Sequence, residues 1–219
     1  ECNSLLDIYK LCRATPNARA TVPALIDPKP SEKDIPQLVG NESTQLVEAL
    51  NKWPGKTNAP NLSPENLQGE IKEWESILQE AVNNGVYKCG FARNQKAYEM
   101  ASEQLFNALN IVEESLSKKG PWLCGETLTL ADIRLFPTLI RWEAVYEKLF
   151  KCTQKPLWLY PKIWNWRKRM YQITEVSNTC DSNSWTNDYF GALFPLNPSN
   201  IIPKGANLTK IINSSILDN

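Results

Sequence analysis

The sequence predicts a mainly helical protein that begins with a short α/β part. The first roughly 50 residues follow the order helix, strand, strand, helix, whereas residues 64–190 carry apolar residues at helical spacing almost throughout. A proline-containing stretch at residues 53–63 separates these parts and has the composition of a linker. Several prolines then predict an extended C-terminal arm over residues 191–219.

The α/β part, residues 1–52, contains four predicted elements. Apolar side chains share one face of a helix over residues 5–12. The segments Thr21–Asp27 and Ile35–Val39 have the composition of short strands. A second helix is predicted from Ser43 onward. This order matches part of a thioredoxin-like domain, without a strand, a helix and a second strand that would precede it.

The helical part begins where Ser63 and Pro64 offer an N-cap followed by proline at the first helical position. Apolar stripes predict helices over residues 67–82, 98–116 and 157–171. Thr129 and Asp132 have the spacing of a capping box, which predicts another helix start. In the C-terminal arm, a short helix is predicted near Ile211.

Composition excludes several classes of function. Lys and Arg total 24, and Asp and Glu also total 24, so no net charge favours nucleic acid or an anionic membrane. The chain has no histidine, the commonest general base and zinc ligand, which argues against a metal site or a Ser-His-Asp triad. No apolar run reaches the roughly 20 residues that span a bilayer. A soluble protein without a membrane span is expected.

The six cysteines occur singly, without a Cys-x-x-Cys pair, as expected for reduced thiols inside the cell. The chain begins with Glu1 rather than methionine, which predicts that another segment preceded it. We therefore expect the cytoplasm, or an organelle such as the chloroplast or mitochondrion after removal of that segment.

Six separated motifs, in the right order, resemble the Xi class of glutathione transferases, the glutathionyl-hydroquinone reductases. The resemblance covers nearly the whole chain. It implies a thioredoxin-like domain that binds glutathione and a helical domain that holds the second substrate. The motifs are Tyr9 to Asp27, Asn41-Glu-Ser43, Gly85-Val-Tyr-Lys-Cys-Gly-Phe-Ala92, Ala131-Asp-Ile-Arg-Leu-Phe136, Phe150-Lys-Cys152 and Leu196-Asn-Pro-Ser-Asn-Ile-Ile-Pro-Lys-Gly205.

The resemblance places glutathione at two segments. A cis bond between Val22 and Pro23 would expose backbone to the cysteinyl part of glutathione, although only roughly 5% of X-Pro bonds in proteins are cis. Glu42 would receive the γ-glutamyl ammonium. Ser43 and the helix start would bind its carboxylate, or Ser43 would be simply an N-cap. Glutathione is thus the implied cofactor, and no metal is expected.

The resemblance also implies a hydroquinone pocket lined by tyrosines, where a phenol would hydrogen-bond to an aromatic hydroxyl. Without the flanking motifs, a tyrosine on a helical stripe is usually a core residue. Phe190 replaces a family tyrosine, and Asp188 and Leu193 replace family histidines, which weakens the expectation of activity. The matching tyrosines are Tyr87, Tyr146 and Tyr189.

Two functions follow. The family's nucleophile is a cysteine in a Cys-Pro-Trp type motif, and no residue here matches it. The favoured interpretation is a glutathione-transferase-like pseudoenzyme, a non-catalytic structural or interaction subunit. Its protein partners would form a multi-subunit complex or a homodimer, without nucleic acid. The alternative is the ordered or processed part of a glutathionyl-hydroquinone reductase that acts by thiol exchange with glutathione.

Overall fold

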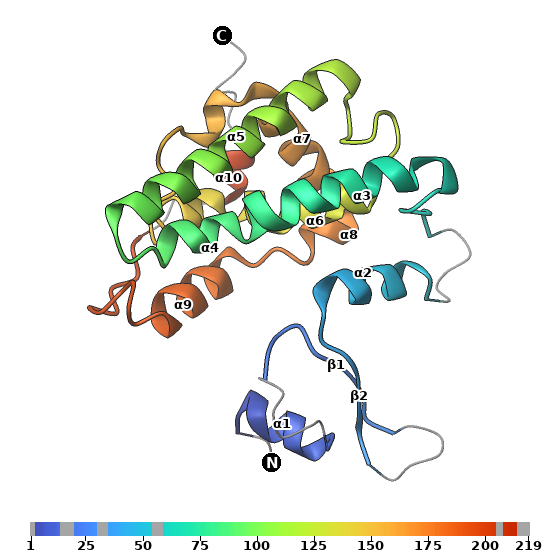
Figure 1. Ribbon diagram of the computed structural model, residues 1–219, viewed down its shortest axis with the longest axis vertical. Helices are drawn as coiled ribbons and strands as arrows, with labels where there is room; N and C mark the ends of the chain where they lie inside the picture. Colours follow the sequence, from blue (N-terminus) through green and yellow to red (C-terminus); the bar gives the residue numbers. More distant parts are fainter. Residues whose placement is uncertain (1–2, 14–19, 30–34, 54–58, 205–207, 214–219) are drawn as a thin grey trace. The chain divides into compact units, whose positions relative to one another are not determined.

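The computed structural model describes residues 3–13, 20–29, 35–53, 59–204 and 208–213. Its mainly helical architecture with one small sheet has the predicted class (Figure 1). The chain divides into two compact units, Glu1–Asn61 and Leu62–Asn219. The finer domain and linker boundaries drawn from the sequence stay predictions, and residues 54–58 of that linker lie outside the described residues.

The first unit contains two helices and a two-stranded antiparallel sheet. The Ser4 hydroxyl caps the first helix by accepting a bond of 3.2 Å from the Asp7 N–H. In the sheet, Ile26 lies opposite Leu38, with a bulge next to this pair. The elements are α1 (Leu5–Leu11), β1 (Leu25–Asp27), β2 (Gln37–Gly40) and α2 (Ser43–Asn51).

Strand β1 is shorter than predicted, because it begins at Leu25 rather than at Thr21. Pro23 lies between these two positions and has no N–H to donate to a strand ladder. Residues 21–24 therefore form a connecting segment, which keeps their backbone free of the sheet.

The second unit is helical. Figure 1 shows α3, the π-helical turn η2 and α4 following one another beside the long helix α5. The elements are α3 (Gln68–Ile77), η2 (Leu78–Asn83), α4 (Gly85–Gly90), α5 (Gln95–Lys119), α6 (Leu130–Ile140), η3 (Trp142–Tyr146), α7 (Pro161–Gln172), α8 (Thr174–Ser177), α9 (Ser182–Ala192) and α10 (Leu208–Asn213), with short 3₁₀ turns at Glu65–Leu67 and Leu157–Leu159.

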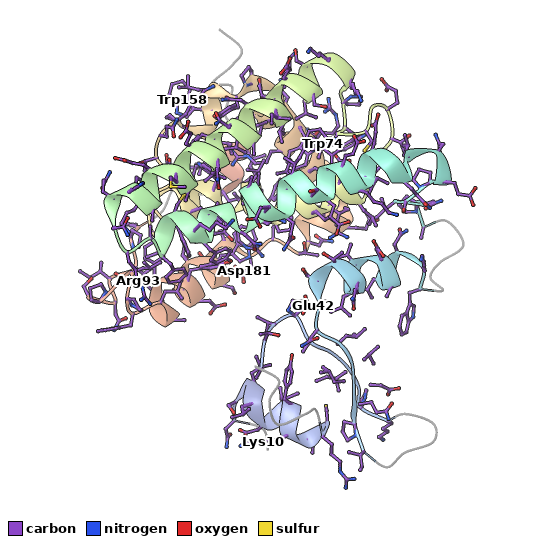
Figure 2. All side chains as sticks on the ribbon, viewed as in Figure 1. Lys10, Glu42, Trp74, Arg93, Trp158 and Asp181 are labelled. Atoms are coloured by element: carbon purple, nitrogen blue, oxygen red, sulfur yellow. The ribbon has the colours of Figure 1, made fainter. Side chains whose placement is uncertain are left out.

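Two predicted helices differ in detail. The stripe over residues 67–82 is interrupted where the Asn84 N–H donates to the Gln79 carbonyl, a π-type bond of 3.0 Å. The helix predicted from Leu157 begins only at Pro161, because proline suits the first helical position. Trp158 precedes this start and is 43% exposed, so it lies outside the core (Figure 2).

The predicted capping box of α6 is confirmed and extends further than its two residues. The Thr129 N–H donates to Asp132 Oδ2 at 3.0 Å. Asp132 Oδ1 accepts from the Leu123 N–H at 3.0 Å and from Trp166 Nε1 at 2.8 Å. Burial raises the pKa of Asp132, and these donors oppose that rise. This carboxylate therefore joins the start of α6 to the preceding loop and to α7.

A buried ion pair fixes the turn η3. Arg167 on α7 is 1% exposed and donates to Glu143 Oε2 at 2.7 Å and to the Leu139 carbonyl at 3.0 Å. The same guanidinium lies over an aromatic face, 4.4 Å from the centre of the Trp164 ring. Because Glu143 belongs to η3, the pair holds in place the turn that ends at Tyr146.

None of the helices within the described ranges is long and apolar enough to cross a membrane.

Candidate phenol and glutathione sites

Three tyrosine hydroxyls meet in the second unit. Tyr87 lies on α4, Tyr146 ends η3, and Tyr189 lies on α9. The hydroxyl oxygens of Tyr87 and Tyr189 are 2.8 Å apart, those of Tyr146 and Tyr189 are 3.0 Å apart, and those of Tyr87 and Tyr146 are 3.3 Å apart. We call this cluster the phenol triad. The structure thus brings together the three tyrosines that the sequence assigned to a pocket, and their role stays a prediction.

Phe150 supports the triad from within the core. Its ring is fully buried and packs edge-on against those of Tyr87, Tyr146 and Tyr189, at centroid distances of 5.2, 5.3 and 6.0 Å. Gly90 makes room for it, since a Cβ at residue 90 would lie 2.3 Å from Phe150 Cδ1. Any larger residue at that position would displace the ring on which the phenols rest.

Two phenols of the triad have a raised pKa and are protonated near neutral pH. Burial raises the pKa of Tyr87 to about 12. Burial and the two neighbouring phenols hold the pKa of Tyr146 above its usual range. Tyr146 is 2% exposed whereas Tyr87 is 37% exposed, so the cluster opens to solvent at Tyr87. Each hydroxyl carries one proton to donate and lone pairs to accept, which suits an aromatic hydroxyl as a ligand.

The positions that depart from the family pattern lie beside the triad. Asp188 is exposed, Leu193 is half-buried, and Phe190 is buried. The Phe190 carbonyl accepts from Asn197 Nδ2 at 2.8 Å. Within the described ranges, the hydroxyls of the triad bond to one another, so these substitutions leave its hydrogen bonds intact.

The first unit holds the segments that were expected to bind glutathione. The Val22–Pro23 peptide bond is cis, as predicted. Val22 is 76% exposed, so its backbone is open to a ligand. The buried Tyr9 fixes this segment from α1 by donating to the Thr21 carbonyl at 2.8 Å. Pro23 and Ser43 line the same pocket of about 240 Å³, together with apolar side chains of β1 and α2.

The alternative in which Ser43 merely caps α2 is wrong. The N-cap residue is Glu42, which has extended backbone angles and makes no side-chain capping bond. Ser43 is the first helical residue, and both side chains are exposed. Figure 2 labels Glu42 at the start of α2. A carboxylate and a hydroxyl therefore face solvent where the helix presents its N-terminal N–H groups.

None of the cysteines with described placement is exposed. Cys89 and Cys152 are buried side by side, and the Cys89 sulfur together with burial raises the pKa of Cys152. A hydrogen bond from Cys152 lowers the pKa of Cys89, which the sequence did not indicate. Among the residues with described placement, no three His, Cys, Asp or Glu side chains gather into a metal-binding group.

Comparison with known proteins identifies the fold and the family. Residues 95–169 match the glutathione S-transferase C-terminal domain. The glutathione transferase Xi 1 structure from Trametes versicolor is 36% identical, with a TM-score of 0.85 over 94% of this chain and 70% of that one. The glutathione-bound structure of the transferase homologue YqjG from Escherichia coli is 32% identical, with a TM-score of 0.85 over 97% of this chain and 68% of that one.

The helical unit is thus that of a glutathione transferase. More narrowly, the chain belongs to the Xi class, the family of the glutathionyl-hydroquinone reductases. The reductase PcpF from Sphingobium chlorophenolicum is 34% identical over 203 residues, which make up 92% of this chain and 63% of that protein. This chain therefore spans less than two thirds of the length of that relative.

Sequence reasoning missed the residues that support the site. Phe150 stands in a quoted motif, but nothing local indicates that its ring contacts three tyrosines from separate elements. Gly90 stands beside Cys89 in another motif, and its closeness to Phe150 is a long-range contact. Tyr9 carried a usable signal, because it is the one tyrosine among the apolar residues of the predicted first helix.

Proposed function

We propose that this chain is part of a glutathionyl-hydroquinone reductase and supplies its phenol pocket and one side of its glutathione site. The phenol triad carries the proposal, because its three hydroxyls meet beside the buried Phe150 ring and open to solvent at Tyr87. Relatives named glutathionyl-hydroquinone reductases support this alternative of the two interpretations. The non-catalytic subunit has no such support.

In the proposed reaction, a thiolate attacks the sulfur of a glutathionyl-hydroquinone. The C–S bond breaks while an S–S bond forms, and the ring carbon takes up the electron pair and a proton to give the free hydroquinone. A glutathione thiol then releases the mixed disulfide as glutathione disulfide. No residue of this chain is assigned the attacking thiolate. The chain's own phenols hold the substrate hydroxyl and orient the ring.

Glutathione is proposed to bind along the first unit. The exposed backbone at Val22 would pair with its cysteinyl part as an added strand does. The Glu42 carboxylate would receive the γ-glutamyl ammonium, and the Ser43 hydroxyl with the start of α2 would bind the carboxylate. Glutathione-bound structures of relatives support this choice of ligand.

The test is turnover by the full-length gene product that contains this chain. A glutathionyl-hydroquinone and glutathione are supplied, and hydroquinone and glutathione disulfide are quantified by chromatography. Tyr146→Phe should lower kcat/KM at least about 10-fold, because it removes a hydrogen-bonding hydroxyl from the pocket. Ser43→Ala should raise the KM for glutathione.

Tyr171→Phe on α7 is the matched control and should retain wild-type turnover. Equal activity of Tyr146→Phe and Tyr171→Phe would refute the role of the triad. An inactive wild-type protein that elutes within a larger assembly would instead support the non-catalytic interpretation.

A further inference from the structure

The triad forms only when α9 keeps one position along its helix axis. Its Tyr189 hydroxyl lies within 3.0 Å of two other hydroxyls, so a shift of α9 along its axis would break both contacts. One turn earlier, Trp185 lies beneath the Arg141 guanidinium, 4.9 Å from the ring centre. These contacts set the face that α9 turns toward η3. A further group bonds to the C-terminal turn of α9, close to Tyr189.

That group is Asn197 in the C-terminal arm. It is 9% exposed, and its Nδ2 donates to the Phe190 carbonyl at 2.8 Å and to the Ile201 carbonyl at 3.1 Å. Its Oδ1 accepts from the Ser199 hydroxyl at 3.3 Å. Both N–H groups and the oxygen of this amide are therefore occupied. A buried amide satisfied in this way specifies one geometry.

The Phe190 carbonyl belongs to the last turn of α9, where carbonyls lack partners within the helix. Glycine caps usually satisfy such carbonyls through the backbone, but α9 ends at Leu193 without a backbone cap of that kind. The Asn197 side chain supplies the missing donor. The Phe190 carbonyl belongs to the peptide between residues 190 and 191, so this bond acts one residue beyond Tyr189.

We infer that Asn197 is a positioning residue for the Tyr189 hydroxyl and thereby sets the geometry of the phenol triad. The amide clamps the end of α9 to the arm, and the arm thus becomes part of the pocket's support. The identity of the ligand rests on the proposed function, whereas the effect on the triad does not.

The test is a double-mutant cycle in the full-length protein with Asn197→Asp and Tyr189→Phe. Asp has the size of Asn but places an oxygen opposite the Phe190 carbonyl, where the donor stood. We expect Asn197→Asp to weaken hydroquinone binding by about 3- to 10-fold, the effect of one hydrogen bond. In the Tyr189→Phe background, the same change should weaken binding less than about 2-fold, because its target is absent.

Ser199→Ala is the matched control, since it removes a bond to Asn197 but keeps both donors to carbonyls. It should bind hydroquinone like the wild type. Alkaline absorbance titration of the tyrosines provides a second readout that needs no ligand. There, Asn197→Asp should shift the tyrosinate step of Tyr87, whose hydroxyl lies 2.8 Å from that of Tyr189, and should not shift it in the Tyr189→Phe background.

Equal effects of Asn197→Asp in both backgrounds, or no effect in either, would overturn the inference. A wild-type protein that does not bind hydroquinone would count against the proposed function only, and the absorbance cycle would still decide the role of Asn197. If Asn197→Asp does not fold, Asn197→Gln keeps the amide but displaces it. The same cycle then applies, with the same outcomes supporting or overturning the inference.

Discussion

Replacement of Gly90 by alanine tests whether Phe150 supports the triad. The new Cβ would lie 2.3 Å from Phe150 Cδ1 and 2.9 Å from Cγ. Carbon atoms in contact prefer about 3.5–4.0 Å, so the fully buried ring must withdraw by at least about 1.2 Å. Overpacking of this kind costs about 1–3 kcal/mol, and the helix regains about 0.5–1 kcal/mol on losing a glycine. At the middle of these ranges, the net loss is about 1 kcal/mol.

For a chain of this length, a loss of about 1 kcal/mol lowers Tm by about 2–4 °C. Because the ring contacts all three phenols, hydroquinone binding should also weaken by about 3- to 10-fold. Thermal unfolding and binding calorimetry measure the two effects. Gly69→Ala in α3 is the matched control, because nothing lies within 4 Å of its new Cβ, and its Tm should equal or exceed that of the wild type. If Gly90→Ala unfolds at the same temperature as Gly69→Ala and binds hydroquinone as tightly, the reasoning is wrong.

Three further outcomes are expected. The folded-state pKa of Tyr87 is about 12, against an ordinary value of 10.0. The contribution of Tyr87 to stability is therefore complete below pH 10.0 and is lost as the pH rises toward 12. Thermal unfolding across this range should show the decline. Cys152 is 0% exposed and should resist alkylation in the folded protein, whereas the half-buried Cys12 reacts; peptide mass spectrometry after alkylation distinguishes them. Asp132→Asn puts an amide N–H beside the Thr129 N–H and should lower the free energy of unfolding by about 1–3 kcal/mol, which is measured as a lower Tm. The control Asp181→Asn, at the exposed N-cap of α9, should change Tm far less.

Features that depend on neighbouring residues could be predicted from the sequence. The capping box of Thr129 and Asp132 needs only a spacing of three residues, so the sequence predicts both of its members. The start of α7 could also have been placed, because Pro161 carries the local signal for a first helical position. The π-helical turn at Leu78–Asn83 could not, since an apolar stripe tolerates one extra residue in a turn without losing its face.

Features that depend on contacts formed by the tertiary fold could not be predicted from the sequence. The tyrosines of the triad were assigned through the family resemblance, but their mutual hydrogen bonds arise from packing between α4, η3 and α9. The contact of Gly90 with Phe150 likewise joins segments far apart in the chain. The bond from Asn197 to the Phe190 carbonyl spans only seven residues, but it crosses the end of α9, where no helical spacing predicts it. Such contacts are set by the tertiary fold, and the residues next to one member of a contact do not indicate which residue it will touch.

A closed ring of three hydroxyls has a directional property that a row of hydroxyls lacks. When each phenol donates its single proton to one neighbour and accepts from the other, the three hydrogen bonds run around the ring in one of two directions. A neutral ligand hydroxyl that donates to a free lone pair of one phenol leaves all three hydrogen bonds of the ring in place. An anionic oxygen has no proton and must accept one in a hydrogen bond from a phenol. That phenol then no longer donates within the ring, so one of the three hydrogen bonds is lost and the direction of the other two is fixed. Protonation of the incoming ligand thus decides whether the ring stays symmetric or becomes polarised toward it.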